Sequence, residues 1–434
     1  MSYIPQMKVF HDRLLESQYW SHDKIVAEQR AYLTQLLRHA KKAVPFYRAR
    51  LDGVLSQSGE VDWARWEELP VLTRSEALAH NDALASTDLP AHQGATRQSF
   101  TSGSTGPALR VVDSQLSAMY LQAAVHRMQS WHRMDFARDL VLWFGEDSSV
   151  APPPGGEHQG FWGPPWSARA TGRRIVINRY AGTDDVLKLL LEPSVGYFSA
   201  RPAAADAAAQ EALRLGTKVA LDGIFTFSTG VRQDEREDFR KAFGARAIVP
   251  YSAKEGHLVA CQCPTGTHFH INEELVFVEI VDAQGHGCAP GEVGRVLVTP
   301  LYNYAMPFVR YELGDLAAFG PPCQCGRTLR VLDHIAGRVT HMFRLPGDRR
   351  VSMSLSPAVQ EAFGARYWQI AQVEPLLIEV RYVPSRKDSG DERQVIDIIR
   401  QKTVPEMQVR FSRRVDLNRP DGRKFIEYAY EVGS

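Results

Sequence analysis

Helix and strand patterns alternate in the middle of the chain, and this alternation restricts its folds more than any other feature. An alanine-rich helical pattern at 203–215 is followed by the apolar strand pattern VALDGIFTF at 219–227. A charged amphipathic pattern at 233–243, closed by Gly244, is followed by a second strand pattern at 245–251. Because strands separated by helices usually pair in parallel, the sequence predicts an α/β fold around a parallel or mixed sheet.

The rest of the chain is expected to form two further blocks. A helix is predicted at 24–44, ended by Pro45, and two paired strands are predicted at 275–282 and 291–301. From about residue 340 onward the patterns are those of a small α+β domain: a strand at 375–383, a helix at 393–404 and a final strand at 407–415. A chain of 434 residues also exceeds the size of one ordinary core.

These patterns predict two domains. The first, residues 1–338, is a large N-terminal domain of mixed parallel β-sheets and packed helices. The second, residues 339–434, is a small α+β domain at the C-terminus.

Charge and hydropathy exclude several classes of partner. Lys and Arg number 51 against 50 Asp and Glu, so a net charge of +1 gives no overall field that would attract nucleic acid or an acidic membrane. The first twenty residues carry early charges, and no later apolar run approaches the length of a membrane span. We therefore expect a cytoplasmic protein that binds neither nucleic acid nor membrane and holds any anionic ligand in a local site. A homodimer is one of the assemblies that we consider.

The stretch FTSGSTGPALR at 100–110 combines hydroxyls and glycines in a run unsuited to a regular helix or strand. Such clusters are often surface turns. They also form phosphate cradles, because glycine lets backbone N–H groups approach an anion and hydroxyls add donors. The residues concerned are Thr101, Ser102, Gly103, Ser104, Thr105 and Gly106. The P-loop is excluded, since Pro107 and Ala108 stand where it carries Lys and Ser or Thr.

Four other stretches follow in order: YSAKEG at 251–256, GEVGRVLVT at 291–299, FVRYELGDLA at 308–317 and IAGR at 335–338. Their order and separations resemble the core motifs of the adenylate-forming enzymes. The stretches VPFYR at 44–48 and NYAMPFVRYELGDL at 303–316 resemble in particular the phenylacetate–CoA ligase and coenzyme F390 synthetase branch. The resemblance covers nearly the whole chain. It implies ATP-dependent activation of a carboxylic acid as an acyl-adenylate, then acyl transfer to a thiol, with CoA the expected acceptor.

The resemblance also assigns roles around the nucleotide. It implies that TSGSTGP closes over the β- and γ-phosphates of ATP and that Glu255 binds Mg²⁺, a hard cation that prefers oxygen ligands. Asp315 would accept hydrogen bonds from the ribose hydroxyls. Tyr251, with Ser252 beside it, would lie near the adenine, and Arg338 would lie near ribose and phosphate.

Near the C-terminus, NRPDGRKF at 418–425 resembles the family's lysine-bearing loop. Lys424 stands where the catalytic lysine would approach the α-phosphate and the substrate carboxylate, stabilising the charge that builds during adenylate formation. Arg423 beside it leaves the register open by one residue.

The sequence departs from the family's pattern in three places. The glycine-rich stretch lacks the lysine often found just after it, which leaves open whether Arg110 replaces that lysine. Lys254 stands where a threonine is usual and places a cation beside Glu255. Val339 and the two residues after it follow IAGR where the hinge normally carries an aspartate, so the domain rotation is less directly implied than adenylation.

The cysteines form a second constellation. Cys261 and Cys263 are followed by His268 and His270, and later by Cys323 and Cys325, whereas Cys288 has no partner in this pattern. In a cytosolic protein, separated thiol and imidazole groups fit tetrahedral zinc better than disulfides, and some relatives in the phenylacetate–CoA ligase branch carry a comparable set. The preferred ligands are Cys263, His270, Cys323 and Cys325, with Cys261 and His268 as substitutes. Four protein ligands would make the site structural; free buried cysteines are the alternative.

The acid-binding wall is expected just before YSAKEG, at the distance at which the family places it: Phe225, Phe227, Ser228, Thr229 and Gly230. Aromatic residues in VLWFGED at 141–147 and GFWGPPW at 160–166 would suit an aryl or other small flat acid, with core packing as the alternative.

Two functions remain open from the sequence. The first is an ATP- and Mg²⁺-dependent acid–thiol ligase, with an amine or a carrier protein as alternative acceptors. The second is a nucleotide- and zinc-binding homologue that has lost turnover, which the departures at Lys254 and at the hinge would explain.

Overall fold

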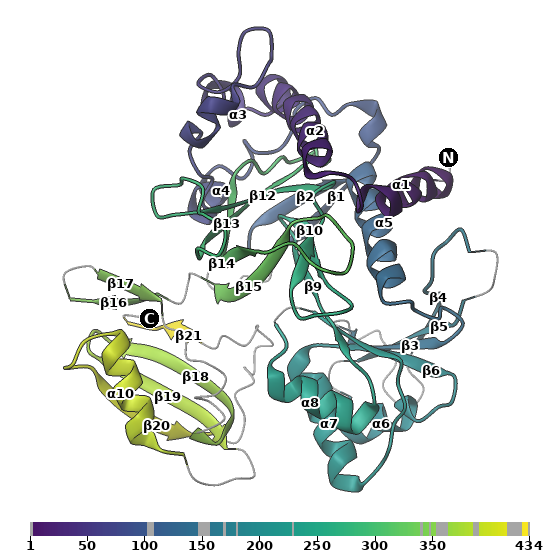
Figure 1. The fold of residues 1–434 in the computed structure, drawn as a ribbon, viewed down its shortest axis with the longest axis vertical. Coiled ribbons are helices and arrows are strands. Elements are labelled where there is room, and N and C mark those ends of the chain that lie inside the picture. Colours follow the sequence, from purple (N-terminus) through teal and green to yellow (C-terminus); the bar gives the residue numbers. More distant parts are fainter. Residues whose placement is uncertain are drawn as a thin grey trace. The chain divides into compact units, whose positions relative to one another are not determined.

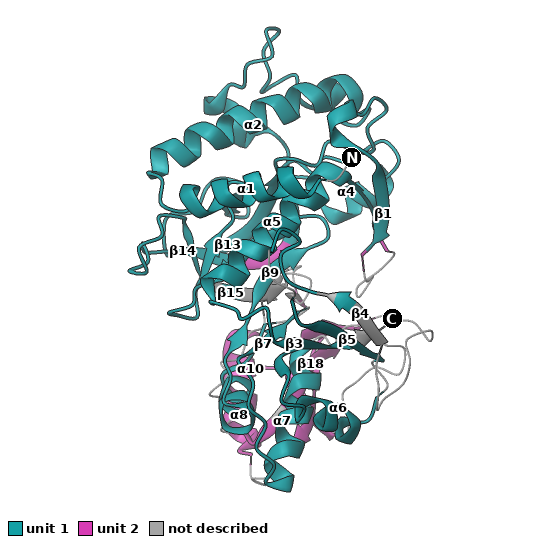
Figure 2. Cartoon of the chain, turned by 90° about the vertical axis from the view of Figure 1, so that its right-hand side faces the viewer, with its two compact units in different colours: residues 1–100, 110–313, 317–335 teal, residues 101–109, 314–316, 336–434 magenta. Residues whose placement is uncertain are grey.

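A computed structural model describes residues 3–101, 108–145, 157–167, 171–178, 181–227, 230–338, 342–346, 349–352, 363–384, 390–414 and 428–432. The chain divides into two compact units, coloured separately in Figure 2. Unit 1 comprises residues 1–100, 110–313 and 317–335; unit 2 comprises residues 101–109, 314–316 and 336–434. The expected fold class is confirmed, because parallel and antiparallel sheets occur together with helices packed on them.

Unit 1 contains a six-stranded sheet in the order β4-β5-β3-β6-β7-β8. Strand β4 is antiparallel to β5, and the remaining neighbours pair in parallel. The strands are β3 Asp139–Gly145, β4 Glu157–Phe161, β5 Arg173–Asn178, β6 Val195–Ala200, β7 Gly223–Thr226 and β8 Ala247–Ile248. Helices α6 Thr183–Leu190, α7 Pro202–Leu215 and α8 Gln233–Phe243 pack their apolar sides against this sheet in one core (Figure 1).

The β7–α8–β8 segment confirms the predicted strand–helix–strand unit. Helix α8 spans the predicted residues and ends at Gly244, whose φ of 65° is a left-handed conformation that glycine adopts without strain. The prediction of one strand at 245–251 is wrong. The chain leaves β8 after Ile248 and enters β9 at Pro250, in a different sheet. Proline lacks the amide hydrogen that a continued ladder would need.

The second sheet of the chain has seven strands in the order β12-β13-β14-β15-β11-β10-β9. Its first pair is the antiparallel pair predicted after residue 260, with Val276 opposite Pro300. The strands are β9 Pro250–Ala253, β10 His257–Gln262, β11 Phe269–Ile271, β12 Val276–Val281, β13 Gly294–Pro300, β14 Tyr311–Gly320 and β15 Val331–Arg338.

The N-terminal part of unit 1 is mainly helical. The predicted helix at 24–44 is α2, which begins where Ser21 caps the amide of Lys24 and ends before Pro45. Phe10 and Leu14 of α1 pack against α5. The elements are α1 Ile4–Ser17, α2 His22–Ala43, α3 Tyr47–Arg50, α4 Arg74–Ala79, α5 Gln115–Trp131, the 3₁₀ helices η1 Trp63–Glu68 and η2 Ala91–Gln93, and the hairpin β1 Thr96–Phe100 with β2 Arg110–Ser114. In the described part of the chain, no helix combines the length and apolar character needed to cross a membrane.

Unit 2 carries the predicted α+β pattern. Its four-stranded sheet has the order β20-β19-β18-β21, and Val395 and Ile399 of α10 are buried in the core that the sheet contributes to. The elements are β16 Met342–Leu345, β17 Arg349–Ser352, β18 Ala365–Glu374, β19 Leu377–Pro384, α10 Glu392–Lys402, β20 Gln408–Arg413 and β21 Tyr428–Tyr430.

Arg310 joins several segments of unit 1 from a fully buried position. Its guanidinium pairs with Glu279 of β12 at 3.1 Å and donates to the carbonyl oxygens of Glu67 at 2.8 Å and Leu69 at 2.6 Å. A further N–H donates to the Gly285 oxygen at 2.8 Å. A buried cation is tolerated when its donors are satisfied in this way. Arg310 therefore fixes the backbone from which Tyr311 and strand β14 begin.

Candidate active site

Glu255 lies in the tight turn that joins β9 to β10, and it is only 8% exposed. Its Oε1 atom accepts a hydrogen bond from the Tyr311 hydroxyl at 3.2 Å and forms an ion pair with Nη1 of Arg74 at 3.3 Å. In the described part of the chain, Oε2 receives no hydrogen bond. The carboxylate is thus held by one oxygen and has a second oxygen for a cation.

Tyr311 is a fixed donor to this carboxylate. Burial, and then the negative charge of Glu255, raise the pKa of Tyr311 well above its ordinary value. The phenol therefore stays protonated across the physiological range, and its O–H remains directed at Glu255.

His257 connects the same turn to strand β2 and helix α5 of unit 1. It has a φ of 57°, which side chains rarely adopt. Its Nε2 lies 2.7 Å from Oδ1 of Asp113, and its Nδ1 lies 3.2 Å from Oγ of Ser117. A neutral ring that donates from Nε2 and accepts at Nδ1 satisfies both contacts. Although these three residue types form hydrolytic triads elsewhere, Ser117 is 2% exposed, so the arrangement positions the turn instead.

The hairpin of β1 and β2 holds the ends of the TSGSTGP stretch together. Phe100 pairs with Arg110 across the hairpin. Beyond that pair, the Thr101 N–H donates to the Leu109 oxygen at 2.9 Å, and Oγ1 of Thr101 accepts from the Leu109 N–H at 3.0 Å. Ser102, Gly103, Ser104, Thr105 and Gly106 lie outside the described residues.

The other predicted nucleotide residues occupy several elements. Tyr251 and Ser252 lie on β9, half-buried and exposed respectively, on the strand that leads into the Glu255 turn. Asp315 is half-buried in β14, directly after Gly314, whose φ is 80°. Gly230 is exposed in a loop, and Arg338 is the last residue of β15. Ser228, Thr229 and Lys424 lie outside the described residues.

The predicted aromatic wall is partly core. Trp143 and Trp162 are both buried, and their indole N–H groups donate to the carbonyl oxygens of Asn178 at 3.1 Å and Arg138 at 2.8 Å. Phe225 packs against Tyr197, with ring centroids 6.3 Å apart. These two tryptophans are therefore anchored in the structure of unit 1, as the core-packing alternative expects.

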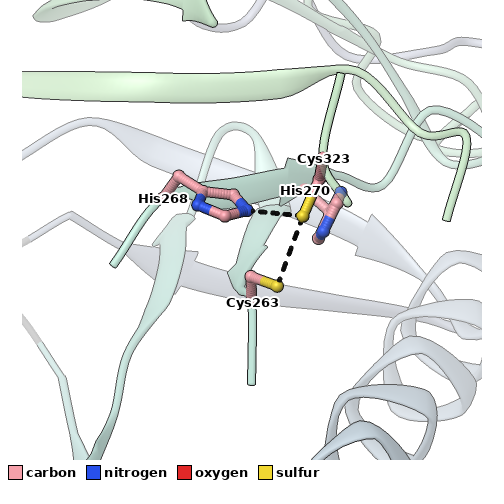
Figure 3. A group of neighbouring side chains, drawn as sticks. All are labelled: Cys263, His268, His270 and Cys323. Atoms are coloured by element: carbon pink, nitrogen blue, oxygen red, sulfur yellow. Dashed lines mark hydrogen bonds between the residues drawn. The ribbon is translucent and has the colours of Figure 1, made fainter. Parts of the chain in front are cut away.

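The cysteines and histidines form a separate cluster, drawn in Figure 3. Ligand atoms of Cys263, His268, His270 and Cys323 all lie within 4.8 Å of one another. Nε2 of His268 is 3.0 Å from Sγ of Cys323, which is 3.8 Å from Sγ of Cys263. Residues from the end of β10, from β11 and its approach, and from the loop between β14 and β15 thus converge on one point.

A hydrogen bond to the backbone orients one member of this cluster. Nδ1 of His270 donates to the Leu329 oxygen at 3.3 Å, so Nε2 is the ring nitrogen that carries the lone pair. Burial lowers the pKa of His270 to about 4, so the imidazole is neutral. Sγ of Cys325 lies 3.3 Å from that Nε2 and also accepts from Nη1 of Arg327 at 3.4 Å.

The structure therefore groups the preferred residues Cys263, His270 and Cys323 with the substitute His268, and places Cys325 at the edge. Cys261 is elsewhere, 4.0 Å from Oδ1 of Asn272 in the apolar core. Burial raises the pKa of its thiol to about 11.

Sequence reasoning missed three residues that hold the site. Arg74 lies far from every motif, and nothing in its local sequence marks it. Tyr311 stands in the quoted stretch FVRYELGDLA, four positions before Asp315, and His257 directly follows YSAKEG. Their adjacency to the motifs was a usable signal, but their contacts depend on the tertiary fold.

Replacing His257 tests whether its ring and its strained backbone position the turn. His257→Ala should lower the free energy of unfolding by about 2–4 kcal/mol, because the contacts of the ring with Asp113 and Ser117 are lost. His257→Gly should recover about 1 kcal/mol of that loss. Urea unfolding measures both.

The pair Arg133→Ala and Arg133→Gly is the control, since Arg133 is exposed and has a φ of 50°. In the control pair, Arg133→Gly should be more stable than Arg133→Ala by about the same 1 kcal/mol, whereas Arg133→Ala should not show the loss expected for His257→Ala. If His257→Ala were as stable as the wild type, the positioning role would be wrong.

Comparison with known proteins gives local sequence matches. No family model matches the chain. Phenylacetate-coenzyme A ligase of Escherichia coli strain K12 is 34% identical over 119 residues, 26% of this chain and 27% of that protein. The Thermus thermophilus enzyme of the same name is 38% identical over 80 residues, 18% of each chain. The matched segments thus span about a quarter or less of these relatives.

Comparison of folds covers far more of the chain. 2-Hydroxyisobutyryl-CoA ligase, solved in the postadenylation state in complex with 2-HIB-AMP, matches 95% of this chain and 91% of its own, with a TM-score of 0.67 and 17% identity. The amide bond synthetase McbA from Marinactinospora thermotolerans matches 76% of this chain and 67% of its own, with a TM-score of 0.52 and 16% identity. The resemblance expected from the motifs is confirmed: the chain has the fold of the adenylate-forming ligases and carries stretches similar in sequence to phenylacetate-coenzyme A ligase.

Proposed function

We propose that the chain is an adenylate-forming acid–thiol ligase that activates an aryl or other small carboxylic acid with ATP and passes the acyl group to CoA. The observation that carries the proposal is a buried carboxylate, Glu255, on the YSAKEG turn of a chain whose fold matches a ligase solved with 2-HIB-AMP. Among the described residues, one oxygen of this carboxylate receives no hydrogen bond. The local matches to two phenylacetate-coenzyme A ligases support an acid of that class.

The reaction has two steps. A carboxylate oxygen of the acid attacks the α-phosphorus of ATP, forming the acyl-adenylate as the bond to pyrophosphate breaks. The thiol of CoA then attacks the acyl carbon, and AMP leaves. Neither step needs a strong acid or base from the protein, so positioning and charge stabilisation dominate.

Each candidate residue has a part in this scheme. Thr101 holds the base of the phosphate loop, and Tyr251 and Asp315 recognise adenine and ribose. Glu255 offers its free oxygen to Mg²⁺, whose charge would offset that of the phosphates. Lys424 and Arg338 supply cations near the α-phosphate, and residues 339–434 act as a mobile domain between the two steps.

The proposal predicts acid-dependent exchange of pyrophosphate into ATP. A panel of aryl, amino and short-chain acids should contain at least one that supports exchange, and CoA should then yield the acyl-CoA thioester, detected by mass spectrometry. If ATP binds and no acid supports exchange, the chain is instead a homologue without turnover. Exchange without thioester formation would direct the search to an amine or carrier-protein acceptor.

Replacing Glu255 tests the magnesium assignment. Glu255→Gln should raise the Mg²⁺ concentration for half-maximal exchange about tenfold, because a neutral amide is a weaker ligand for a hard dication. Glu237→Gln, a change at an exposed residue of α8, is the control and should leave the Mg²⁺ dependence unchanged. A wild-type Mg²⁺ dependence in Glu255→Gln would remove this residue from the site.

We further propose that the Cys/His cluster holds one structural zinc ion. Two sulfur and two nitrogen ligands within 4.8 Å fit tetrahedral zinc, and four protein ligands leave no position open for a substrate. The hydrogen bond from His270 to the Leu329 oxygen would fix the orientation of the ring, with Nε2 available to the metal. The ion would join β10 and β11 to the loop before β15.

Elemental analysis should find one zinc per chain in protein purified without a chelator. Cys263→Ser combined with Cys323→Ser should remove the metal and cost ~3 kcal/mol of stability, a fall of roughly 6–12 °C in Tm. Cys288→Ser, outside the cluster, should change neither quantity. Full zinc content in the double variant would refute the assignment, and Cys325→Ser alone reports whether the edge thiol contributes.

A further inference from the structure

Lys254 is an exposed cation at the start of the Glu255 turn, and its ammonium donates a hydrogen bond to the carbonyl oxygen of Phe100. Phe100 is the last residue of β1, directly before the TSGSTGP stretch. Within the described part of the chain, no carboxylate lies within ion-pair distance of Lys254. Its positive charge is therefore uncompensated at the end of the hairpin.

The neighbouring cations are already neutralised. Arg110, the residue opposite Phe100, pairs with Asp82 at 2.7 Å and with Oδ1 of Asn81 at 3.0 Å. Arg74 pairs with Glu255 at 3.3 Å. Arg97 is exposed, but it lies three residues back along β1, roughly 10 Å from Phe100 in an extended strand.

We propose that Lys254 binds the polyphosphate of the nucleotide and is the cation that neutralises the leaving pyrophosphate. The proposal rests on the proposed function, which requires a triphosphate to be held while its α-phosphorus is attacked. An ammonium has three N–H donors, and the bond to Phe100 uses one of them. Two donors and the full charge remain for phosphate oxygens.

The contact also places this cation beside the glycine-rich stretch. The Lys254 side chain reaches Phe100, the residue before the stretch, and the sequence has no lysine between Gly106 and Arg110. Arg110 is committed to Asp82, so Lys254 is the cation at this end of the hairpin that has no carboxylate partner among the described residues.

A purely structural role for Lys254 is the competing explanation. A lysine that donates to a carbonyl could simply hold the hairpin against the turn. Lys254→Gln distinguishes the structural role from phosphate binding, since the glutamine amide can still donate a hydrogen bond but carries no charge. Lys254→Arg keeps the charge. Arg97→Gln is the matched control, because it removes an exposed cation from the same hairpin that has no partner among the described residues.

The test uses inorganic tripolyphosphate as the probe and calorimetric titration of the full chain. Lys254→Gln should weaken tripolyphosphate binding about tenfold, Lys254→Arg should stay within about threefold of the wild type, and Arg97→Gln should bind as the wild type does. The same tenfold increase is expected in the KM for ATP during exchange. Equal binding by Lys254→Gln and wild type would overturn the proposal, as would an equal loss in Arg97→Gln or no binding by the wild type.

A measurement on the unmodified protein covers the case in which Lys254→Gln misfolds. Tripolyphosphate should protect Lys254 from acetylation, followed by peptide mass spectrometry, and should not protect the exposed Lys218. Unprotected Lys254 would contradict the proposal. Failure of all acids in exchange would refute the ligase function, while these two binding experiments would still decide the role of Lys254.

Discussion

The buried guanidinium of Arg310 is the contact on which the candidate site depends. A fully buried cation requires partners for its donors, and Arg310 finds them in Glu279 and in carbonyl oxygens of the 66–69 and 285 segments. This arrangement fixes the backbone at the start of β14. Because Tyr311 is the next residue, the same anchor sets the position of the hydroxyl that holds Glu255.

Three sets of contacts hold the Glu255 turn in place. Tyr311 and Arg74 hold the carboxylate through a hydrogen bond and an ion pair. His257 holds the backbone through its two ring nitrogens, at the cost of a strained φ. Lys254 reaches Phe100 at the end of the hairpin. A carboxylate fixed in this way is preorganised, as the proposed binding of Mg²⁺ would require.

The Cys/His cluster shows how much of a site can be predicted from residue types alone. Thiols and imidazoles in two separated groups were sufficient to predict a cluster that could hold a metal ion, and most of its members. The sequence did not predict which cysteine of the pair Cys261 and Cys263, or which of the two histidines, would join the cluster. Alternation along a strand would direct Cys261 and Cys263 to the same side, but β10 ends at Gln262, so Cys263 turns toward His268 while Cys261 stays in the core.

The sequence by itself determined the elements whose signals are local: α2, α8 and the β12–β13 pair follow from periodicity, capping residues and turn composition. It also identified Glu255 and the cysteines as candidate site residues, because a carboxylate or a thiol has the same chemistry wherever the fold places it. Only the tertiary structure decided that 245–251 divides between two sheets, that Arg74 pairs with Glu255 and that Lys254 meets Phe100. These outcomes depend on distances between residues far apart in the chain, which packing sets and local periodicity does not encode.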